Sequence, residues 1–308
     1  MPNYTNRIGL PGPIARALSS DGYQKGDRPS NISVTSLIGS PLISELKIRH
    51  DKEITEDVSD RVWSLLGNSV HYILEKAADD DSIAEKRLYM DIDGWTVTGQ
   101  TDLFEGTVKD KKEFNILSDF KVTSIYAFLL GQKEEWVAQL NLNAMLWRHA
   151  GYDVHKVQII AILKDWSSMK ARLDPNYTQC AVHIVNIPLW DQSSAVAYAK
   201  KRVALHKAAR AQKNEDKIPT CTDDEKWYRG GSFAVMKDGN KKASAVRSTE
   251  EDAKIAMHEL MQQRPKDKFS VVERPGEYIR CTRFCTVSKW CKFFRENLAD
   301  RIVNDSED

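Results

Sequence analysis

The spacing of apolar residues along the chain predicts alternating helices and strands. Apolar positions recur at helical spacing over four segments, from Ser33 or Thr35 to Lys47, from Thr55 or Asp57 to Ala78, from 133 to 150 and from 191 to 212. Shorter apolar or alternating runs predict strands over 86–92, 95–101, 114–122, 154–163 and 180–187. Asp93-Gly94 is typical of a tight hairpin turn. The order helix, three-stranded antiparallel meander, helix and strand indicates an α/β fold with a mixed central sheet.

The composition of the sequence changes near both ends of this core. Residues 1–31 are rich in Pro, Gly, Ser and Asn and predict an irregular segment, followed by the core over 32–220. Residues 221–303 predict a small α+β insertion that leads into a cysteine cluster, and 304–308 form an acidic tail. Within this region strands are predicted over 233–236, 243–247 and 269–273, with a helix over 250–263.

Composition excludes several classes of protein. The 308 residues carry 45 Lys and Arg against 44 Asp and Glu, a net charge of +1, which excludes a uniformly basic nucleic-acid coat. No apolar run approaches the roughly 18 residues of a membrane span. The first 30 residues lack the apolar core of a signal peptide. We therefore expect a cytoplasmic protein without a membrane partner.

The most informative chemistry lies at the third predicted strand. Asp119 and Lys121 are two residues apart, so their side chains project from the same face of a strand. Asp102 ends the second strand, and antiparallel pairing is expected to bring it close to Asp119. Two neighbouring carboxylates favour a hard cation such as Mg²⁺ or Mn²⁺. Lys121 would orient a water or stabilise charge on a phosphate. The alternative for Asp119 and Lys121 is a solvated ion pair.

Two helices add polar residues to this picture. His71 and Glu75 are four residues apart and share a helix face, so His71 can add an imidazole to a carboxylate site. Gln139 lies on the helix after the third strand, where it can bind water or phosphate. The alternatives are a histidine that is an ordinary core or surface residue and a glutamine at a polar position on a half-exposed helix.

Four motifs then occur in a recognisable order: Gly67-x-x-x-His71, Gly99-x-x-Asp102, Asp119-x-Lys121 and the helical Gln139. Over residues 33–165 this order resembles the RecB-like branch of the PD-(D/E)XK nuclease superfamily. The resemblance implies a restriction-endonuclease-like core.

The resemblance also implies roles for particular residues. His71, Asp102 and Asp119, with the main-chain carbonyl of Phe120, would be the metal ligands. Lys121 would be the catalytic lysine, with Asp102, Asp119, Gln139 and Glu75 as further catalytic residues. One departure is Asn143, which stands where the family usually has a tyrosine.

The activity implied by the resemblance is Mg²⁺- or Mn²⁺-dependent hydrolysis of DNA, as an exonuclease acting on single- or double-stranded ends. It also implies a place in DNA recombination, repair or phage DNA processing, with a helicase, a recombinase or a single-strand-binding protein as partner. Two alternatives stay open: a non-catalytic nucleic-acid-binding protein that keeps the fold, and an iron–sulfur or zinc protein with a redox or structural role.

The C-terminal cysteines indicate a second site. Cys281, Cys285 and Cys291 are spaced C-x₃-C-x₅-C, and three thiolates need a fourth ligand to hold zinc or a cubane cluster. Cys221 is the best candidate, whereas Cys180 lies in an apolar strand and indicates core packing. The triplet is similar to the cluster-binding cysteines of several RecB-like nucleases, which implies a [4Fe-4S] cluster. Zinc and unligated thiols are the alternatives.

Basic residues near these cysteines are candidates for contacts with nucleic-acid phosphates. Arg280, Arg283 and Lys289 lie among the cysteines, and Lys241 and Lys242 lie on the predicted hairpin of the insertion. The alternative for the insertion is a structural lid over the cysteine site.

Overall fold

The computed structural model describes residues 2–20, 28–79, 82–106, 115–129 and 133–299. The chain forms two compact units, Met1–Ile218 and Pro219–Asp308. The acidic tail predicted over 304–308 lies outside the described residues.

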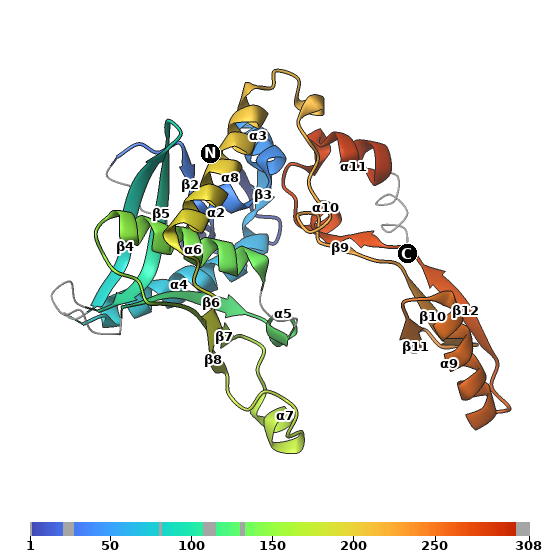
Figure 1. Ribbon diagram of the computed structural model, residues 1–308. Helices are drawn as coiled ribbons and strands as arrows, with labels where there is room; N and C mark the ends of the chain where they lie inside the picture. The colour runs from blue at the N-terminus through green and yellow to red at the C-terminus, as the bar shows by residue number, and fades with distance from the viewer. Residues whose placement is uncertain (1, 21–27, 80–81, 107–114, 130–132, 300–308) are drawn as a thin grey trace. The chain divides into compact units, whose positions relative to one another are not determined.

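The labels of Figure 1 are used throughout. The elements of the first unit are β1 (Asn3–Thr5), α1 (Gly12–Ser19), β2 (Ile32–Ser33), α2 (Val34–Ile38), α3 (Pro41–Arg49), β3 (Thr55–Asp57), the 3₁₀ helix η1 (Val58–Arg61), α4 (Val62–Ala77), β4 (Ser82–Ile92), β5 (Trp95–Glu105), β6 (Ile116–Thr123), α5 (Ile125–Leu129), α6 (Glu134–His149), β7 (Lys156–Leu163), α7 (Ser168–Leu173), β8 (Val182–Ile187), α8 (Gln192–Ala211) and η2 (Glu215–Lys217).

A mixed six-stranded sheet organises the first unit. Its order is β2-β5-β6-β7-β8, and β4 pairs with the other edge of β5. The β4–β5, β5–β6 and β7–β8 pairs are antiparallel, while β2–β5 and β6–β7 are parallel. The Asp93-Gly94 turn closes the β4–β5 hairpin, and its left-handed backbone at both residues explains the choice of Asp-Gly. The predicted mixed α/β class is therefore confirmed.

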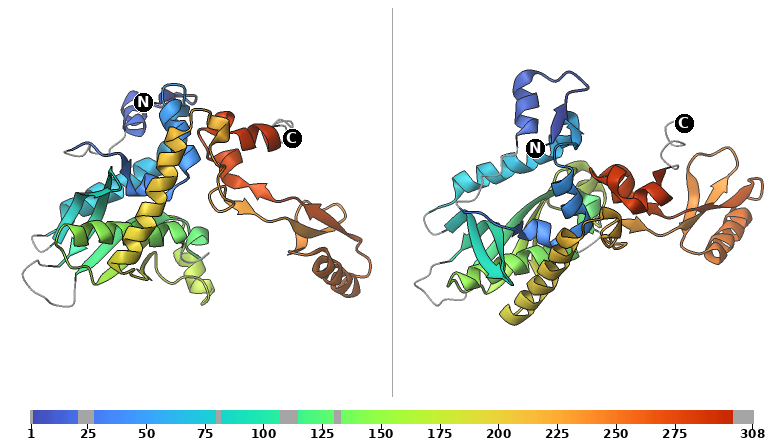
Figure 2. Two further views of the ribbon diagram at one scale, coloured as in Figure 1. Left: turned by 45° about the horizontal axis from the view of Figure 1, so that its top comes forward. Right: turned by 90° about the horizontal axis from the view of Figure 1, so that it is seen from above.

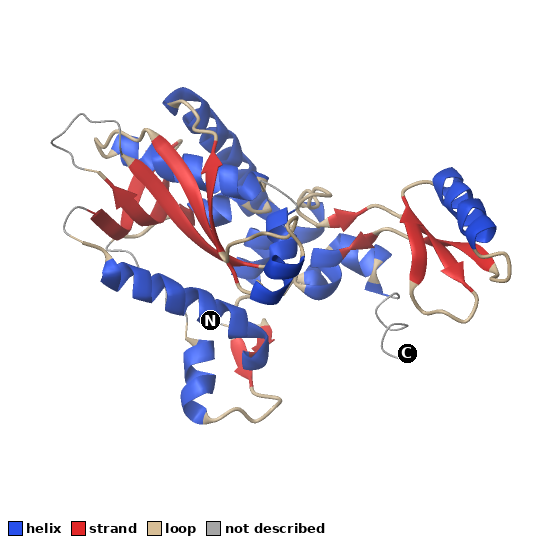
Figure 3. Cartoon of the chain, turned by 90° about the horizontal axis from the view of Figure 1, so that it is seen from below, coloured by secondary structure: helices blue, strands red, loops and turns tan. Residues whose placement is uncertain are grey.

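Helices cover the sheet on both faces, as Figure 3 shows, with α4 along one face and α6 and α8 on the other. The main core lies between α6 and the sheet, where Trp147 stacks on Phe104 with ring centroids 4.2 Å apart. A second core joins α2, α8 and the far end of β5 around Leu37, Val97 and Val203. Both cores bury large apolar side chains completely, so α6 and α8 hold the sheet rigidly on that face.

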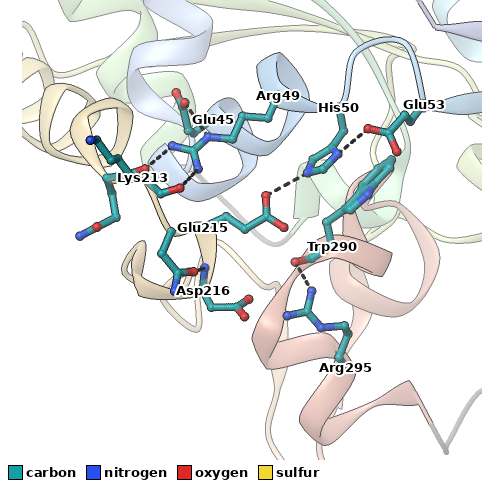
Figure 4. Close-up of polar contacts among 11 residues, drawn as sticks. Glu45, Arg49, His50, Glu53, Lys213, Glu215, Asp216, Trp290 and Arg295 are labelled. Atoms are coloured by element: carbon teal, nitrogen blue, oxygen red, sulfur yellow. Dashed lines mark hydrogen bonds and ion pairs between the residues drawn. The ribbon is translucent and has the colours of Figure 1, made fainter.

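Polar side chains tie α3 to the end of α8, and Figure 2 shows the two helices side by side. Glu45 accepts ion pairs from Arg49 at 2.9 Å and from Arg210 of α8 at 3.2 Å. The guanidinium of Arg49 also donates to the main-chain carbonyls that follow α8 (Figure 4). His50, at the end of α3, lies between Glu53 and Glu215, 2.8 and 2.9 Å away (Figure 4).

The second unit holds a small sheet and a cysteine-bearing segment. Strands β10 (Ser232–Lys237), β11 (Ala243–Arg247) and β12 (Phe269–Arg274) form an antiparallel sheet in the order β11-β10-β12, against which α9 (Glu250–Gln263) buries Ala253 and Ala256. The remaining elements are β9 (Tyr228–Arg229), β13 (Glu277–Tyr278), α10 (Ile279–Arg283), η3 (Ser288–Trp290) and α11 (Lys292–Asn297). The predicted strands and helix of the insertion are confirmed.

Four predicted elements need correction. The segment 1–31 is not irregular throughout, because α1 begins at a proline-compatible position and buries Leu18, and β1 pairs with β3. The helix predicted to reach Lys47 is two helices, since Gly39 and Pro41 break it. The helix predicted from Thr55 or Asp57 starts at Val62, after β3 and η1. The second strand continues to Glu105, so Asp102 lies inside β5 and not at its end.

In the part of the chain that the structure describes, none of the helices has the length and apolar character needed to cross a membrane.

Candidate metal centre and cysteine site

The site begins where β5 and β6 separate. Their pairing covers Leu103–Glu105 and Ile116–Ser118, and β5 pairs with β2 further back, at Val97 and Thr98. Asp102 is the first residue beyond the β5–β6 ladder. Its Oδ2 accepts a hydrogen bond of 2.6 Å from the main-chain N–H of Phe120, so the carboxylate takes the place of a ladder carbonyl. This bond fixes the Asp102 side chain beside Asp119, the neighbour of Phe120.

A histidine and a second carboxylate meet Asp102 from two other elements. His71 of α4 places Nδ1 3.4 Å from Oδ1 of Asp102 and 3.5 Å from Oε1 of Glu85. One ligand atom from each of these three residues lies within 4.8 Å of the other two. The pKa of His71 is raised to about 10, chiefly by the hydrogen bonds with Asp102 and then Glu85. A proton on the imidazole thus neutralises two carboxylates, which is the electrostatic role that a cation would fill.

Glu85 is a site residue that the sequence analysis missed. It lies on β4 between Ala84 and Lys86, which pair with Leu103 and Thr101, and it therefore stands opposite Asp102. Its φ of 51° is in the left-handed region, which a non-glycine residue adopts at a cost of roughly 1–2 kcal/mol. Strain of this kind persists where the surroundings hold the residue in place, and it aims the Glu85 carboxylate at His71.

A sequence signal for Glu85 exists. The two-residue turn at Asp93-Gly94 fixes the hairpin register, and counting back from it pairs position 85 with position 102. The strand predicted over 86–92 stopped one residue short of it. The side chain of Gln100 further orients the Glu85 carboxylate. Its amide Nε2 donates a hydrogen bond to Glu85, and its amide oxygen Oε1 accepts one from Arg87.

Asp119, Lys121 and Gln139 form a second polar group next to the first. The Lys121 ammonium lies 2.7 Å from Oδ2 of Asp119, and Gln139 of α6 donates to Oδ1 of Asp119 at 2.9 Å while accepting from Lys121 at 3.3 Å. Burial raises the pKa of Asp119 to about 6, Lys121 opposes this shift, and the Asp102 charge adds to it. The mutual influence of Asp102 and Asp119 puts the two groups within one electrostatic site.

The donor set matches a hard divalent cation. Mg²⁺ and Mn²⁺ prefer carboxylate oxygens, and Mn²⁺ also accepts an imidazole. His71, Glu85 and Asp102 supply these atoms, and the ion would offset the Asp102 charge, which adds to the burial that raises the pKa of Asp119. The residues present therefore fit the metal, with Glu85 as an added candidate ligand, and the role of Asp119 as a ligand stays a prediction.

Glu75, a predicted catalytic residue, and Asn143, the departure from the family pattern, are not in the three-ligand group. The carboxylate of Glu75 lies 3.8 Å from the ammonium of the adjacent Lys76. Asn143 is buried against β5, where it donates to the carbonyl of Gln100 at 3.4 Å. A Cβ on Gly99 would come within 2.2 Å of Asn143 Oδ1, so the glycine of Gly99-x-x-Asp102 is required by the close packing of α6. The role of the Phe120 carbonyl stays a prediction.

In the second unit the four predicted cysteines lie near enough for their thiols to interact electrostatically. Burial raises the pKa of the Cys281 thiol to about 12, and the thiols of Cys221, Cys285 and Cys291 add to the shift. Cys180 is exposed on the other unit, so its predicted core packing is wrong.

Hydrogen bonds hold the Cys221 turn against the Cys281 helix. Thr222 and Glu225 form the reciprocal pair of a capping box, at 3.0 and 3.1 Å. Arg280 donates from its main chain to the Lys226 carbonyl and from its guanidinium to the Glu225 carbonyl, both at 3.1 Å. Four sulfur ligands would suit zinc or a [4Fe-4S] cluster, and the joint binding of either by these cysteines stays a prediction.

Comparison with known proteins adds little to these observations. No protein-family model matches the chain, and no curated protein matches it. Among solved structures, one described as "Crystal structure of SSO0001" aligns over 62% of this chain and 84% of its own, with 17% identity and a TM-score of 0.42. A likeness this weak carries no argument about function.

The predicted phosphate-binding residues fall into two kinds. Arg280 is engaged inside the unit, as described above, and this explains its position without a nucleic acid. Arg283 forms an exposed ion pair of 3.6 Å with Glu277, and Lys289 lies over the ring of Trp290. Lys241 and Lys242 are exposed on the loop between β10 and β11. Their contact with nucleic acid stays a prediction.

Proposed function

We propose that this chain is a metal-dependent DNA nuclease, an exonuclease with a RecB-like core that hydrolyses phosphodiester bonds at DNA ends. The observation that carries the proposal is that two groups of polar side chains lie next to each other. The His71, Glu85 and Asp102 ligands meet the Asp119–Lys121 pair through the bond from Phe120 to Asp102. The motif order described above supports the same assignment.

Each residue has a distinct part in this proposal. His71, Glu85 and Asp102 would hold Mg²⁺ or Mn²⁺, with Asp119 beside them. A bound ion of this type polarises a phosphate and lowers the pKa of water. Lys121 places a positive charge where a phosphate oxygen or an attacking water would lie. Gln139 holds both Asp119 and Lys121 and thereby fixes the direction of the ammonium.

The electrostatics support hydrolysis over simple binding of nucleic acid. A surface that only binds a phosphate backbone gains from cations and loses from buried acids. Here two buried aspartates are held close together, with the protonated His71 and the Lys121 ammonium as the cations beside them. A metal that takes the place of the His71 proton would keep this charge balance and would also act on the phosphate.

The test is cleavage of 5′- and 3′-labelled single- and double-stranded DNA in Mg²⁺, Mn²⁺ or EDTA. We expect metal-dependent release of nucleotides by the wild type and loss of about 100-fold or more in Asp119→Asn. The matched control is Asp91→Asn, on the same hairpin, where Asp91 accepts a bond from Thr96 at the exposed end of β4. Binding of DNA by the wild type without cleavage in either metal would favour the non-catalytic alternative.

For the second unit we propose a [4Fe-4S] cluster on Cys221, Cys285, Cys291 and Cys281. The electrostatic influence of the other three thiols on Cys281 supports it, together with the C-x₃-C-x₅-C spacing of Cys281, Cys285 and Cys291. Anaerobic purification should give about four iron atoms and matching sulfide per chain, with loss of both in Cys291→Ser but not in Cys180→Ser. One zinc per chain in place of iron would contradict the cluster.

A further inference from the structure

One side of α4 has three features that the metal site alone does not explain. Trp63, Gly67 and His71 follow one another at four-residue spacing and therefore share a side of the helix. Trp63 is 60% exposed, although it is the largest side chain of α4. A glycine inside a helix costs roughly 1 kcal/mol relative to alanine. Yet a Cβ on Gly67 would meet nothing within 4 Å, so packing does not require it.

A positive charge accompanies the exposed indole. The ammonium of Lys164, just after β7, lies 3.5 Å from the centroid of the Trp63 ring. The main-chain N–H of Lys164 donates to Thr123 at the end of β6, at 2.9 Å, which ties this loop to the strand that carries Lys121. Because Lys121 pairs with Ala161, Lys164 stands three residues further along, roughly 10 Å beyond the catalytic lysine.

We infer that the side of α4 formed by Trp63, Gly67 and His71, together with Lys164, is a track for a single strand of DNA that leads to the metal site. This inference rests on the proposed nuclease function and names its substrate class. The eight residue steps from Trp63 to His71 span about 12 Å along the helix. Three to four stacked nucleotides, at about 3.4 Å each, cover that length.

The chemistry of the track selects an unpaired strand. An exposed indole offers a flat face on which a base can stack only when the base is not paired within a duplex. Lys121 and Lys164 provide two cations at successive distances from the metal, which suits a chain of phosphates. Gly67 leaves the backbone of α4 uncovered between the stacking platform and the metal ligand, so a strand can pass close to the helix.

The same helix supplies a matched control. Tyr72 is 62% exposed and has the ammonium of Lys76 5.6 Å from its ring centroid, so it repeats the aromatic–lysine pair. At helical spacing it lies on the opposite side of α4 from Trp63. If any exposed aromatic residue on α4 bound DNA, Tyr72 would do so equally.

The experiment measures binding of a fluorescent oligonucleotide of about 15 nucleotides, single-stranded or paired, by anisotropy in Ca²⁺. We expect Trp63→Ala to weaken single-strand binding about tenfold, with little change for duplex. Gly67→Leu should weaken it likewise while thermal stability is kept, since the new side chain meets open space. Tyr72→Ala should match the wild type. Equal losses for Tyr72→Ala, equal losses for duplex, or no loss in either track variant would overturn the inference.

A second readout separates this inference from the nuclease proposal. The p-nitrophenyl ester of thymidine 5′-phosphate has one nucleotide and cannot reach Trp63 from the metal site. Its Mn²⁺-dependent hydrolysis should be unchanged in Trp63→Ala, while degradation of the long single strand slows. Hydrolysis of the ester with unchanged oligonucleotide binding in the variants would remove the track and leave the nuclease. Absence of hydrolysis of both substrates by the wild type would remove the nuclease itself, and the track with it.

Discussion

The structure and the sequence pattern indicate different acidic residues for the metal site, Glu85 and Glu75 respectively. Glu85 is in the three-ligand group, whereas Glu75, the acid suggested by the family resemblance, contacts Lys76. Glu85→Gln keeps the shape of the side chain and removes its charge. The Glu85 carboxylate lies 3.5 Å from Nδ1 of His71, and unit charges at that distance interact by at most about 5 kcal/mol at an effective dielectric of 20.

The expected effect on the metal is smaller, because both side chains are partly exposed to solvent. Loss of a partner that merely orients a ligand weakens metal binding by about 10–100-fold. Loss of a direct ligand should reach the upper end, about 100-fold or near 2.7 kcal/mol. Isothermal titration with Mn²⁺ should show this loss for Glu85→Gln and less than a threefold change for Glu75→Gln. The reverse order would refute the ligand assignment.

A consequence for His71 can be measured without metal. With Glu85 neutral, only Asp102 supports the protonated imidazole, so the pKa of His71 should fall from about 10 toward its ordinary value of about 6.5. Proton NMR titration of His71 checks this. An unchanged pKa in Glu85→Gln would mean that Glu85 does not face the ring.

Three other predictions follow from particular contacts. Gly99→Ala should destabilise the chain by about 1–3 kcal/mol in urea unfolding, since the new Cβ would meet Asn143 Oδ1 at 2.2 Å. Gly67→Ala should instead stabilise the chain by about 0.5–1 kcal/mol. Equal effects of the two substitutions would contradict the claim that only Gly99 is required by packing. Trp147→Ala should destabilise by about 3–5 kcal/mol, and a loss under 1 kcal/mol would deny it a core role. Burial lowers the pKa of His50, but the hydrogen bonds with Glu215 and Glu53 leave it raised, so stability from this contact is complete below about pH 6.5 and falls as pH rises through the higher folded value. The free energy of unfolding measured against pH should show this dependence in the wild type but not in His50→Gln. Parallel pH curves for the two proteins would exclude a contribution from His50.

Periodicity predicted the sheet-forming and long helical segments because their apolar side chains are buried on one regular face. The α6 helix and the β4–β5 hairpin are the clearest cases, with Trp147 and Phe104 in the core and Asp93-Gly94 at the turn. The N-terminal helix α1 was not predicted, since it is short and buries only Leu18. The α4 boundary was misplaced because α4 has no fully buried residue, so its apolar pattern does not mark its ends.

The sequence predicted only those site residues that belong to a motif. Asp102, Asp119, Lys121 and His71 occur in recognisable spacing, and the structure places them together. Glu85 belongs to no motif, and its carboxylate enters the site through a left-handed residue that no propensity favours. The difference between Glu75 and Glu85 depends on which side chains converge across separate elements, and a linear pattern does not contain that information.

The most direct test of the metal centre is pulsed electron paramagnetic resonance of Mn²⁺ bound to the chain. Coupling of the Mn²⁺ spin to an imidazole nitrogen should appear in the wild type and in His50→Gln, and it should vanish in His71→Gln while DNA cleavage is lost. Bound Mn²⁺ that shows no nitrogen coupling in the wild type, or that keeps it in His71→Gln, would contradict the ion site on which this account depends.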